Sequence, residues 1–581
     1  MATQPDPTTA ITRREVECVL RDGVALRTTL LVPAGAGPWP ALMTRHPYDV
    51  SGDESGTRVE VDRLVAAGYL VALQDVRGRY GSGGEFDPSA QELDDGADAV
   101  AWLADLPECD GRVGMWGASY ASETQFSALL GGAPALRSIA PAVTPVATGL
   151  DGFRFRGGVP EIGSMTAWSH GAIDPDRIAH LADETERARA QRDWEAADAA
   201  IVSGAAFAAG ALDGEPGGPT LDWMRARLRD PLDAPAHAVG KILGREHEID
   251  VPMLLLGGWY DVFLGSTLRV WRDLPSTAPR HLVVGPWSHD DWTGRLGDLD
   301  FGPTASSGDL GGRDLTRTLI DWFDATLAGR RADPALPPAR VFVMGLDRWV
   351  DLDGFPATGS TERELFLGGD GALTDAVGPA AEATVDVDPA DPVPTRGGAT
   401  LLFPPYGPGP VDQGPLESRA DVLSWRSEPL DAAVAVLGPV EAVIHLASTG
   451  TDADVVVRLS DEHPDGRVIP IADGVQRGSA RATDPLTGAG PVAAIEPGAV
   501  LEYRVDLWST AHVFRPGHRI RVDLTPSSSP RWDVNPGVYP PAAPRRTRNT
   551  VHLGSAHPSR LRLTVPPPEL LGREPGADPA S

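Results

Sequence analysis

The stretch at residues 112–132, R-V-G-M-W-G-A-S-Y-A-S-E-T-Q-F-S-A-L-L-G-G, constrains the fold of this chain more than any other. A short apolar run at 113–116 leads at once into small residues. Beyond them, apolar side chains recur at helical spacing from Phe126 to Leu130. This order predicts a strand, a sharp turn and a helix in immediate succession.

Ser119 stands at the centre of the predicted turn. Such a turn holds a serine on a strained backbone with its hydroxyl clear of the sheet, which requires small residues two positions before and after it, here Gly117 and Ala121. The usual pattern ends in glycine, so Ala121 adds one methyl group. The following helix directs its free N–H groups to the space above the hydroxyl, where an oxyanion can be held. The alternative is that Ser119 only caps the helix.

Composition limits the partners of the chain. Its 581 residues exceed what one hydrophobic core supports, so several domains are expected. The formal charge of −30 disfavours nucleic acid and anionic membranes, because both need a basic surface. A solvated acidic surface is the simplest explanation of this charge, and a cationic substrate stays open.

The cysteines and the first residues favour the cytoplasm. Cys18 and Cys109 are the two cysteines of the chain, too few for a disulfide framework or a cysteine-based zinc site. Residues 1–14 lack the apolar core of a signal peptide, and no window approaches the ~20 apolar residues of a membrane span. We therefore expect a cytoplasmic protein.

Alternation of strands and helices predicts an α/β domain from residues 1–144 and 241–334. The expected strands are 16–20, 25–32, 41–44, 69–74, 113–116, 253–257 and 281–284, and the expected helices are 59–67, 90–106, 268–274 and 316–327. This alternation indicates a mostly parallel sheet covered on both faces, with ligands at the carboxyl ends of its strands.

Two further segments depart from this alternation. Residues 145–240 include Ala-, Glu- and Arg-rich stretches at 174–207 and 223–228, which predict a helical cap inserted over the strand ends. Residues 335–581 instead carry short strands between Gly- and Pro-rich turns, as expected of a jelly-roll β-sandwich. Its clearest strands are 340–344, 363–367, 440–447, 454–460, 500–507 and 519–524.

Three chemically complementary residues follow predicted strands. Ser119, Asp261 and His289 each stand just past a strand end, in the order nucleophile, acid, histidine expected of α/β-hydrolases. Asp290 and Asp291 are rivals to Asp261, but neighbours of the histidine cannot easily turn back onto its ring. No metal-ligand spacing or phosphate-binding loop is apparent, so no metal and no cofactor are expected.

Many segments of the chain match those of one protein family, in the same order along the sequence. The chain resembles the cocaine esterase family of serine hydrolases, which includes X-Pro dipeptidyl peptidases, α-amino acid ester hydrolases and glutaryl acylases. The matching segments are R-H-P-Y-D at 45–49, Q-D-V-R-G-R-Y-G-S-G-G-E-F at 74–86, C-D-G-R-V-G-M-W-G-A-S-Y at 109–120, G-W-Y-D-V-F at 258–263, G-P-W-S-H at 285–289, D-W-T-G-R at 291–295, V-R-L-S-D at 457–461, G-H-R-I-R-V-D-L at 517–524 and S-S-S-P-R-W-D-V-N-P at 527–536.

The resemblance implies an α/β-hydrolase core, an inserted helical cap and a C-terminal jelly roll. It also implies an oxyanion hole made by the Tyr48 phenol and the Tyr120 N–H. The positions that match an aromatic acyl pocket are Phe153, Trp168 and Phe263. His46 stands at a position where this family more often has a small polar residue. Its effect on the charge of the site is an open point.

We expect a serine carboxylesterase or acylase that cleaves small-molecule esters, with amides also open, through a Ser119–His289–Asp261 triad. The alternatives are an α-amino acid ester hydrolase and an X-Pro dipeptidyl peptidase, which need carboxylates near the acyl pocket to bind an ammonium group. Asp151, Glu161 and Asp174 are the candidates by proximity. A non-catalytic carbohydrate- or surface-binding protein is the alternative of another class. We expect no nucleic acid or membrane partner, and a homo-oligomer stays open.

Overall fold

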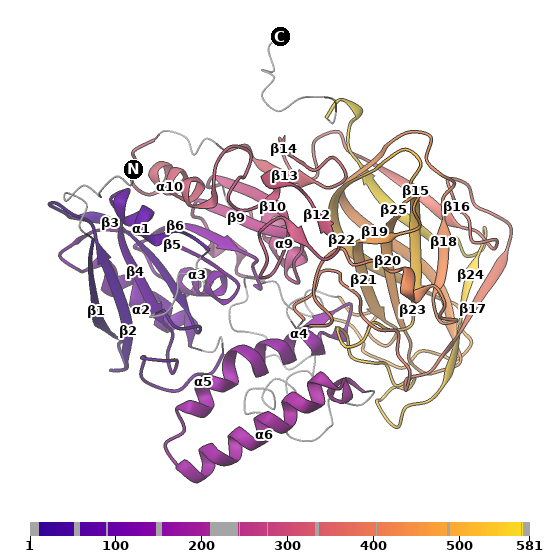
Figure 1. The fold of residues 1–581 in the computed structure, drawn as a ribbon, viewed down its shortest axis with the longest axis horizontal. Helices are drawn as coiled ribbons and strands as arrows, with labels where there is room; N and C mark the ends of the chain where they lie inside the picture. Colours follow the sequence, from indigo (N-terminus) through magenta and orange to yellow (C-terminus); the bar gives the residue numbers. More distant parts are fainter. Residues whose placement is uncertain are drawn as a thin grey trace.

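A computed structural model describes residues 11–50, 58–88, 91–146, 154–208, 242, 244–275, 277–331, 336–402, 404–484, 489–570 and 572. An α/β sheet lies at one end of the molecule and a β-sandwich at the other, with helices beneath the junction between them (Figure 1). This is an α/β-hydrolase core with an inserted helical cap and a C-terminal jelly roll, as the sequence predicts.

The core sheet has ten strands in the order β1-β2-β4-β3-β5-β6-β9-β10-β13-β14. The first two form an antiparallel hairpin, and the pairs from β4 through β13 are parallel. Parallel strands covered on both faces are apolar throughout, as in β9, where every residue is buried. The strands are β1 (Thr12–Val19), β2 (Ala25–Val32), β3 (Trp39–His46), β4 (Leu70–Asp75), β5 (Cys109–Ala118), β6 (Leu136–Ala142), β9 (Met253–Tyr260), β10 (Arg280–Ser288), β13 (Ala339–Val343) and β14 (Arg348–Leu352).

Helices pack on the strands of this sheet. Two of them, α2 (Glu92–Ala104) and α3 (Tyr120–Leu130), pack together against β5. The other pair in contact is α1 (Val61–Ala66) and α10 (Leu315–Thr326), while α9 (Leu264–Asp273) packs on β9. None of the helices in the described ranges combines the length and apolarity that crossing a bilayer requires.

The strand pairing corrects the sheet predicted for residues 340–344. The sequence pattern predicts this strand as part of the β-sandwich, but β13 pairs in parallel with β10, and β14 pairs with β13. A short apolar strand has the same sequence pattern in either sheet, so the pattern could not decide which sheet it joins. The core sheet therefore extends to Leu352.

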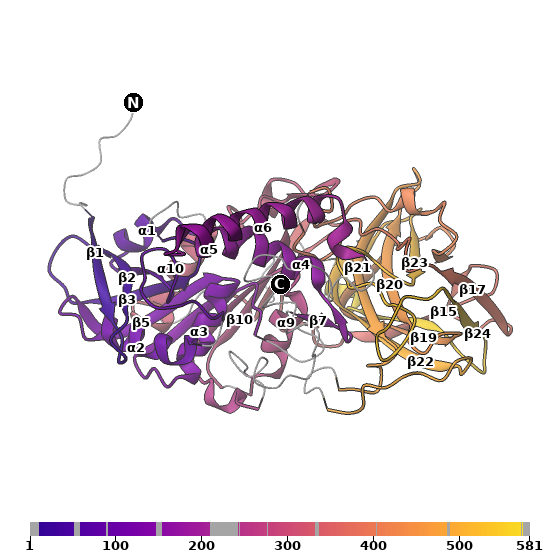
Figure 2. The same ribbon diagram turned by 90° about the horizontal axis from the view of Figure 1, so that it is seen from below.

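Helices fill the segment between the core strands β6 and β9. After the small ribbon β7 (Phe155–Arg156) and β8 (Val159–Pro160) come α4 (Ile162–Thr166), the π-helix η3 (Ala167–Ile173), α5 (Asp174–Ala179), α6 (Glu184–Val202) and the 3-10 turn η4 (Ala205–Phe207). These helices run from the core toward the β-sandwich (Figure 2). The predicted helix at 174–207 is thus divided into α5 and α6, and the one at 223–228 lies outside the described residues.

The β-sandwich packs two antiparallel sheets. One has the order β16-β15-β25-β19-β24-β17 with β22 paired to β19, and the other has the order β18-β23-β20-β21. The strands are β15 (Thr361–Leu367), β16 (Leu373–Thr374), β17 (Ala381–Val387), β18 (Leu423–Arg426), β19 (Val434–Ser448), β20 (Asp454–Glu462), β21 (Val468–Arg477), β22 (Leu501–Phe514), β23 (Arg519–Thr525), β24 (Thr547–Leu553) and β25 (Arg560–Val565).

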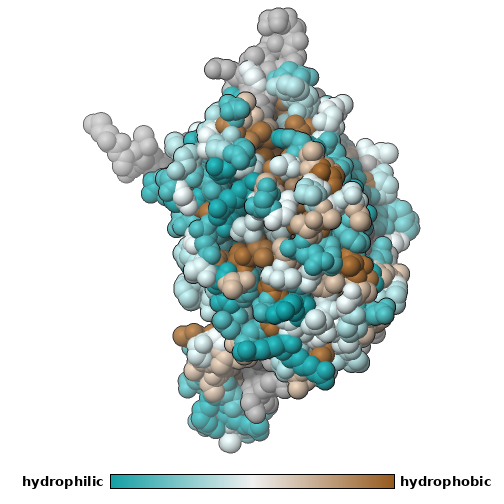
Figure 3. Space-filling model, turned by 90° about the vertical axis from the view of Figure 1, so that its right-hand side faces the viewer, coloured by the Kyte–Doolittle hydropathy of each residue, from teal (hydrophilic) through white to brown (hydrophobic). Residues whose placement is uncertain are grey.

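The outer surface of the β-sandwich is mostly hydrophilic, with apolar residues scattered among polar ones (Figure 3). Among the described residues, the exposed large hydrophobic side chains are Val19, Val202, Leu346 and Val377. They come from separate parts of the chain, and single exposed apolar residues are normal on a soluble surface.

Candidate active site

Ser119 occupies a strained turn between β5 and α3. Its backbone angles, φ 61° and ψ −122°, lie in a region that non-glycine residues rarely adopt. The surrounding structure holds this conformation: the Ser119 N–H donates to the carbonyl of Ala142 at 2.9 Å, and the Ser119 carbonyl accepts from the N–H of Ser122 at 2.8 Å. The Ser119 side chain is partly exposed, whereas residues 113–118 are buried.

Gly117 makes this turn possible. Its φ of +142° disfavours any side chain, and a Cβ added there would lie 2.5 Å from the Cβ of Ala121 and 2.9 Å from Oγ1 of Thr44. The close approach of strand and helix therefore has room for the methyl of Ala121 because position 117 has none. Ala121 itself is buried, with 1% of its surface exposed.

His289 and Asp261 form a buried hydrogen-bonded pair at the ends of the neighbouring strands β10 and β9. His289 Nδ1 lies 2.7 Å from Asp261 Oδ2. The other oxygen, Oδ1, accepts the N–H of Phe263 at 2.7 Å. The two side chains are 7% and 0% exposed. A proton on Nδ1 bonded to the carboxylate leaves Nε2 as the basic nitrogen of the imidazole.

The two rival carboxylates have other surroundings. The Asp290 side chain is 77% exposed, and Asp291 Oδ1 accepts hydrogen bonds from the N–H and hydroxyl of Thr293. Arg58 holds this loop in place: it donates to the carbonyl of His289 and, at 3.1 Å, to the carbonyl of Asp290. Sequence reasoning missed Arg58, because these contacts join residues more than 200 positions apart.

Tyr48 follows β3 and carries its phenol to Ser119. The phenol oxygen accepts the indole N–H of Trp168 at 3.0 Å. Burial raises the pKa of Tyr48 to about 12, although hydrogen bonds with Trp168 and Ser119 act in the opposite direction. The phenol therefore keeps its proton at neutral pH and can donate a hydrogen bond to a developing oxyanion.

His46 supports the Tyr48 backbone as a neutral side chain. Its Nδ1 accepts the N–H of Tyr48 at 3.2 Å, and the two rings stack with centroids 5.7 Å apart. Burial lowers the pKa of His46 to about 4, against the attraction of Asp49. His46 therefore adds no positive charge to the site near pH 7.

Tyr120 begins α3 and is held from behind by a buried polar network. Its hydroxyl donates to Glu92 Oε1 at 3.0 Å, and Arg45 Nη1 contacts Glu92 Oε2 at 2.9 Å. Arg45 in turn donates from Nε to Oε1 of Gln74 at 2.6 Å. The network joins β3, β4 and α2 to the first residue of the helix, so it fixes the orientation of the Tyr120 backbone beside Ser119.

The three residues predicted to line the acyl pocket have different outcomes. Phe263 packs edge-on against the imidazole of His289, with ring centroids 5.1 Å apart. Trp168 is buried and donates to Tyr48, so it orients the phenol as well as contributing apolar surface. Phe153 lies outside the described residues. Trp168 belongs to an apolar cluster with Tyr48 packed on it, formed by Val76, Phe86, Tyr120, Phe155, Met165, Trp168, Ile173 and Ala480.

Arg79 ties the loop before Tyr48 to the cap. Its guanidinium donates to the carbonyls of Pro47 at 3.0 Å, Ile173 at 2.8 Å and Ala172 at 3.1 Å, and it pairs with Asp176 at 3.2 Å. The side chain is completely buried. Sequence patterns give Arg79 no role, because its partners on the cap are about 95 positions away.

The carboxylates considered for ammonium binding are buried or outside the described residues. Glu161 is 1% exposed, accepts the indole N–H of Trp532 at 2.8 Å and lies 3.5 Å from Arg531 Nε. Asp174 is also fully buried. Burial lowers the pKa of the neighbouring Arg177 guanidinium, and the charge of Asp174 acts in the opposite direction. Asp151 is outside the described residues.

Known proteins match nearly the whole chain. The family model described as X-Pro dipeptidyl-peptidase (S15 family) matches residues 22–291, and the X-Pro dipeptidyl-peptidase C-terminal non-catalytic domain matches residues 333–562. The cocaine esterase of Rhodococcus sp. (strain MB1 Bresler) is 33% identical, over 94% of this chain and 97% of that protein.

Solved structures agree in fold. The structure of an aminopeptidase from a marine sediment Thaumarchaeota archaeon is 25% identical with a TM-score of 0.78, covering 97% of this chain and 98% of that chain. An α-amino acid ester hydrolase at 23% identity has a TM-score of 0.76 over the same shares. The non-catalytic alternative is therefore set aside, and this chain belongs to the cocaine esterase family of serine hydrolases.

Proposed function

We propose that the protein is a serine carboxylesterase in which Ser119 is the nucleophile, His289 the general base and Asp261 the residue that orients His289. The observation that carries the proposal is the buried hydrogen bond of 2.7 Å between His289 Nδ1 and Asp261 Oδ2. This bond fixes the tautomer whose Nε2 can take a proton from a serine hydroxyl. The parallel strands that lead to the three residues end at the same edge of the sheet.

The reaction proceeds through an acyl-enzyme. Ser119 Oγ attacks the ester carbonyl while His289 accepts its proton, and His289 then returns the proton to the leaving alcohol. A water molecule, activated by the same imidazole, cleaves the acyl-serine bond and restores the free hydroxyl. Asp261 stabilises the imidazolium in both steps. The reaction uses three side chains of the protein and a water molecule, so the proposal uses no cofactor.

The Tyr48 phenol and the Tyr120 N–H form the proposed oxyanion hole. Support comes from the raised pKa of Tyr48, which keeps its proton on the oxygen, and from the position of Tyr120 at the first residue of α3. A donor preorganised by Trp168 costs no reorganisation when the carbonyl oxygen becomes negative. Such stabilisation is worth about 2.7–4 kcal/mol for one donor.

An uncharged acyl group suits the described surroundings of the site better than an α-ammonium group. The side chains around Tyr48 and Trp168 are apolar, Phe263 lies against His289, and Glu161 is already engaged by Trp532 and Arg531. We therefore expect faster hydrolysis of an N-acylated aminoacyl ester than of the same ester with a free amine. The reverse preference would instead favour an α-amino acid ester hydrolase or an X-Pro dipeptidyl peptidase.

Ser119→Ala tests the nucleophile directly. The variant should lose p-nitrophenyl ester turnover by several orders of magnitude and keep the melting temperature of the wild type, because the alanine retains the Cβ on the same backbone. Turnover is measured from p-nitrophenol release, with Ser122→Ala in the first turn of α3 as the matched control. Wild-type turnover in Ser119→Ala would reject the assignment.

The cytoplasm remains the proposed location. It is supported by the two cysteines, which are both buried as free thiols, as expected in a reducing compartment.

A further inference from the structure

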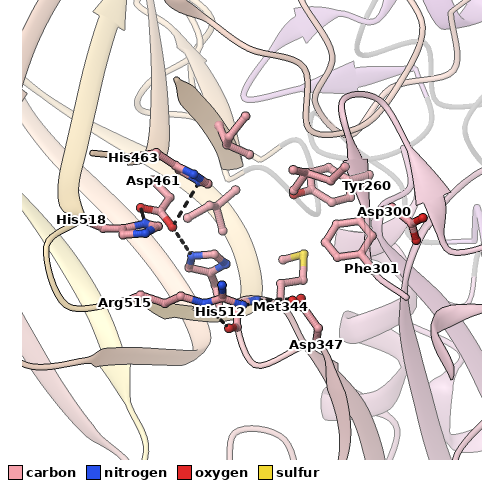
Figure 4. Close-up of a pocket in the computed structure, with 14 residues that line it drawn as sticks. Tyr260, Asp300, Phe301, Met344, Asp347, Asp461, His463, His512, Arg515 and His518 are labelled. Atoms are coloured by element: carbon pink, nitrogen blue, oxygen red, sulfur yellow. Dashed lines mark hydrogen bonds and ion pairs between the residues drawn. The ribbon is translucent and has the colours of Figure 1, made fainter. Parts of the chain in front are cut away.

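A cluster of imidazoles surrounds one carboxylate on the side of the β-sandwich that faces the core sheet (Figure 4). Asp461 lies on β20 and is 3% exposed. His518 Nδ1 lies 2.8 Å from Asp461 Oδ1, and His463 Nε2 lies 3.8 Å from Asp461 Oδ2. The ligand atoms of these three residues all lie within 4.8 Å of one another.

The strand register explains why these side chains meet. Asp461 and His463 are two positions apart, so they point to the same face of the extended chain. The pairing of β20 with β23 runs through Glu462 and Arg519, and its continuation sets His463 opposite His518. Their rings accordingly lie with centroids 4.5 Å apart.

His512 approaches the same carboxylate from the other sheet of the sandwich. It lies on β22, and its Nε2 is 3.1 Å from Asp461 Oδ2. Ligating carboxylates in metal sites are commonly held by such a hydrogen bond from a neighbouring side chain. His512 therefore has the position of a residue that orients Asp461.

The cluster borders a cavity of about 120 Å³. Tyr260, Phe301 and Met344 form the side of the cavity that belongs to the core domain. A water molecule occupies about 30 Å³ in the liquid, so the cavity has room for an ion with bound water. The cation Arg515 also lines it, but its guanidinium pairs with Asp347 at 3.1 Å and donates to the carbonyl of Gly345 at 2.7 Å.

We propose that Asp461, His463 and His518 bind a divalent transition-metal ion, with Zn²⁺ as the best match to the donor set, and that His512 orients the carboxylate. Two imidazole nitrogens and one carboxylate oxygen are typical zinc ligands, with metal–ligand bonds of about 2.0–2.2 Å. In a tetrahedral site such bonds set the ligand atoms about 3.3 Å apart. Rotation of the side chains brings the three atoms to that spacing, and water from the cavity fills the fourth position.

Hydrogen bonding alone explains only part of the cluster. His512 and His518 each lie within hydrogen-bonding distance of one Asp461 oxygen, which satisfies the carboxylate. His463 Nε2, at 3.8 Å, is too far for a hydrogen bond to Asp461 and yet faces it. The other ring nitrogen of His463, Nδ1, lies 3.5 Å from Arg467 Nη2. A metal ion between the three residues would give Nε2 a partner as well.

A bound ion would strengthen the sandwich where it meets the core. It would join β20 to the segment before β23 and, through His512, to the opposite sheet. The cavity also borders Tyr260, the residue before Asp261, so the ion would stabilise the packing behind the acid of the active site. We therefore expect zinc to raise the melting temperature of the full chain.

The test is zinc binding by the full-length protein after removal of metals with a chelator. Isothermal titration with zinc chloride should give one site per chain, and thermal unfolding should show a higher melting temperature with zinc than without. His463→Gln and His518→Gln should each weaken zinc binding at least about tenfold and remove most of the zinc-dependent rise in melting temperature. His463→Gln is the sharper variant, because it removes a ligand without breaking a hydrogen bond to Asp461.

The control is His247→Gln, which removes an exposed histidine from another part of the chain and should bind zinc like the wild type. The melting temperature of each variant without metal shows whether it is folded. Absence of zinc binding by the wild type would overturn the proposal. Wild-type affinity in folded His463→Gln and His518→Gln would also overturn it, because the zinc would then bind elsewhere, for example at the imidazole of His289.

Discussion

Tyr48 and the neighbouring His46 are kept neutral by their surroundings. Burial raises the pKa of Tyr48 to about 12 and lowers that of His46 to about 4, so neither changes charge near pH 7. The protonated phenol of Tyr48 can donate a hydrogen bond. The neutral imidazole of His46 beside it does not change its protonation near pH 7. In the proposed mechanism, the imidazole of His289 is the group that accepts and returns the proton.

Tyr48→Phe removes the phenol hydroxyl and keeps the ring. We expect kcat to fall by about 10²–10³, because one oxyanion donor is lost, with a small change in KM. The variant Tyr539→Phe, whose hydroxyl donates to the carbonyl of Val492 in the β-sandwich, is the matched control. Steady-state kinetics on a p-nitrophenyl ester measure the effect, and a kcat within twofold of the wild type would remove Tyr48 from the oxyanion hole.

His46→Asn should reduce the acid sensitivity of the fold. The folded protein binds a proton at His46 only near pH 4, whereas the unfolded chain binds it near the ordinary pKa of 6.5. Unfolding therefore takes up a proton between these values, so the stabilisation by neutral His46 is present above pH 6.5 and is lost as the pH falls to 4. The full change in the free energy of unfolding is about 3 kcal/mol, since one pKa unit corresponds to about 1.4 kcal/mol.

Thermal unfolding at pH 7 and pH 5 measures this loss. The asparagine amide oxygen can accept the Tyr48 N–H in place of Nδ1, and the amide does not titrate. The melting temperature of His46→Asn should therefore fall less on acidification than that of the wild type. The control is His180→Asn, at a side chain that is 53% exposed. An equal loss in His46→Asn and the wild type would show that His46 is not the group responsible.

Among the elements, the buried Arg79 joins the cap to the loop that carries Tyr48. Arg79 bonds to the carbonyl of Pro47 on the loop and to the carbonyls of Ala172 and Ile173 on η3. The same helix carries Trp168, which donates to Tyr48. The π-helical turn and the loop therefore position the phenol together.

Arg79→Lys should loosen this connection. One ammonium cannot reach the acceptors that the planar guanidinium spans, so buried carbonyl groups lose their donors. We expect the free energy of unfolding to fall by about 2–4 kcal/mol and kcat to fall about tenfold as Tyr48 loses its support. Unfolding and ester kinetics test this, with Arg189→Lys on the exposed face of α6 as the control. An unchanged kcat would show that the loop does not depend on the cap.

The sequence predicted the elements that carry the site more completely than those far from it. The strand, turn and helix around Ser119 have local signals, and the expected strands before Asp261 and His289 are found as β9 and β10. The strand β6 was missed because it contains Pro141, which weakens a strand pattern, and β21 was missed because Pro470 and Gly474 interrupt it. The pairing of β20 with β21 accommodates Pro470 through a shift in register.

Contacts between distant segments were beyond local patterns. Arg58, Arg79 and Glu92 had no distinguishing spacing, and each acts through partners that only the fold brings near. The role of Tyr48 came from the family resemblance, since a tyrosine after a strand has no chemical signature of its own. The cluster at Asp461 also has no local sequence pattern, because its histidines come from three separate strand ends.

At the scale of the whole molecule, the core sheet and the β-sandwich meet beside the site. Arg156 of the small β7–β8 ribbon donates to the carbonyl of Asp506 at 3.1 Å and lies 3.4 Å from the ring centroid of Trp508. Tyr260 donates to the carbonyl of Pro470 at 3.1 Å. These contacts link the cap and the strand before Asp261 to the sandwich, and the three parts meet in the middle of the molecule (Figure 1).

In the proposed mechanism, Ser119 is activated by a relay assembled from three segments of the chain. Labelling with a fluorophosphonate probe, followed by peptide mass spectrometry, tests it most directly, because the probe reacts with an activated serine. We predict one adduct, on Ser119, that is lost in Ser119→Ala and strongly slowed in His289→Ala. An adduct on another residue, or equal labelling of Ser119 in His289→Ala, would contradict the account.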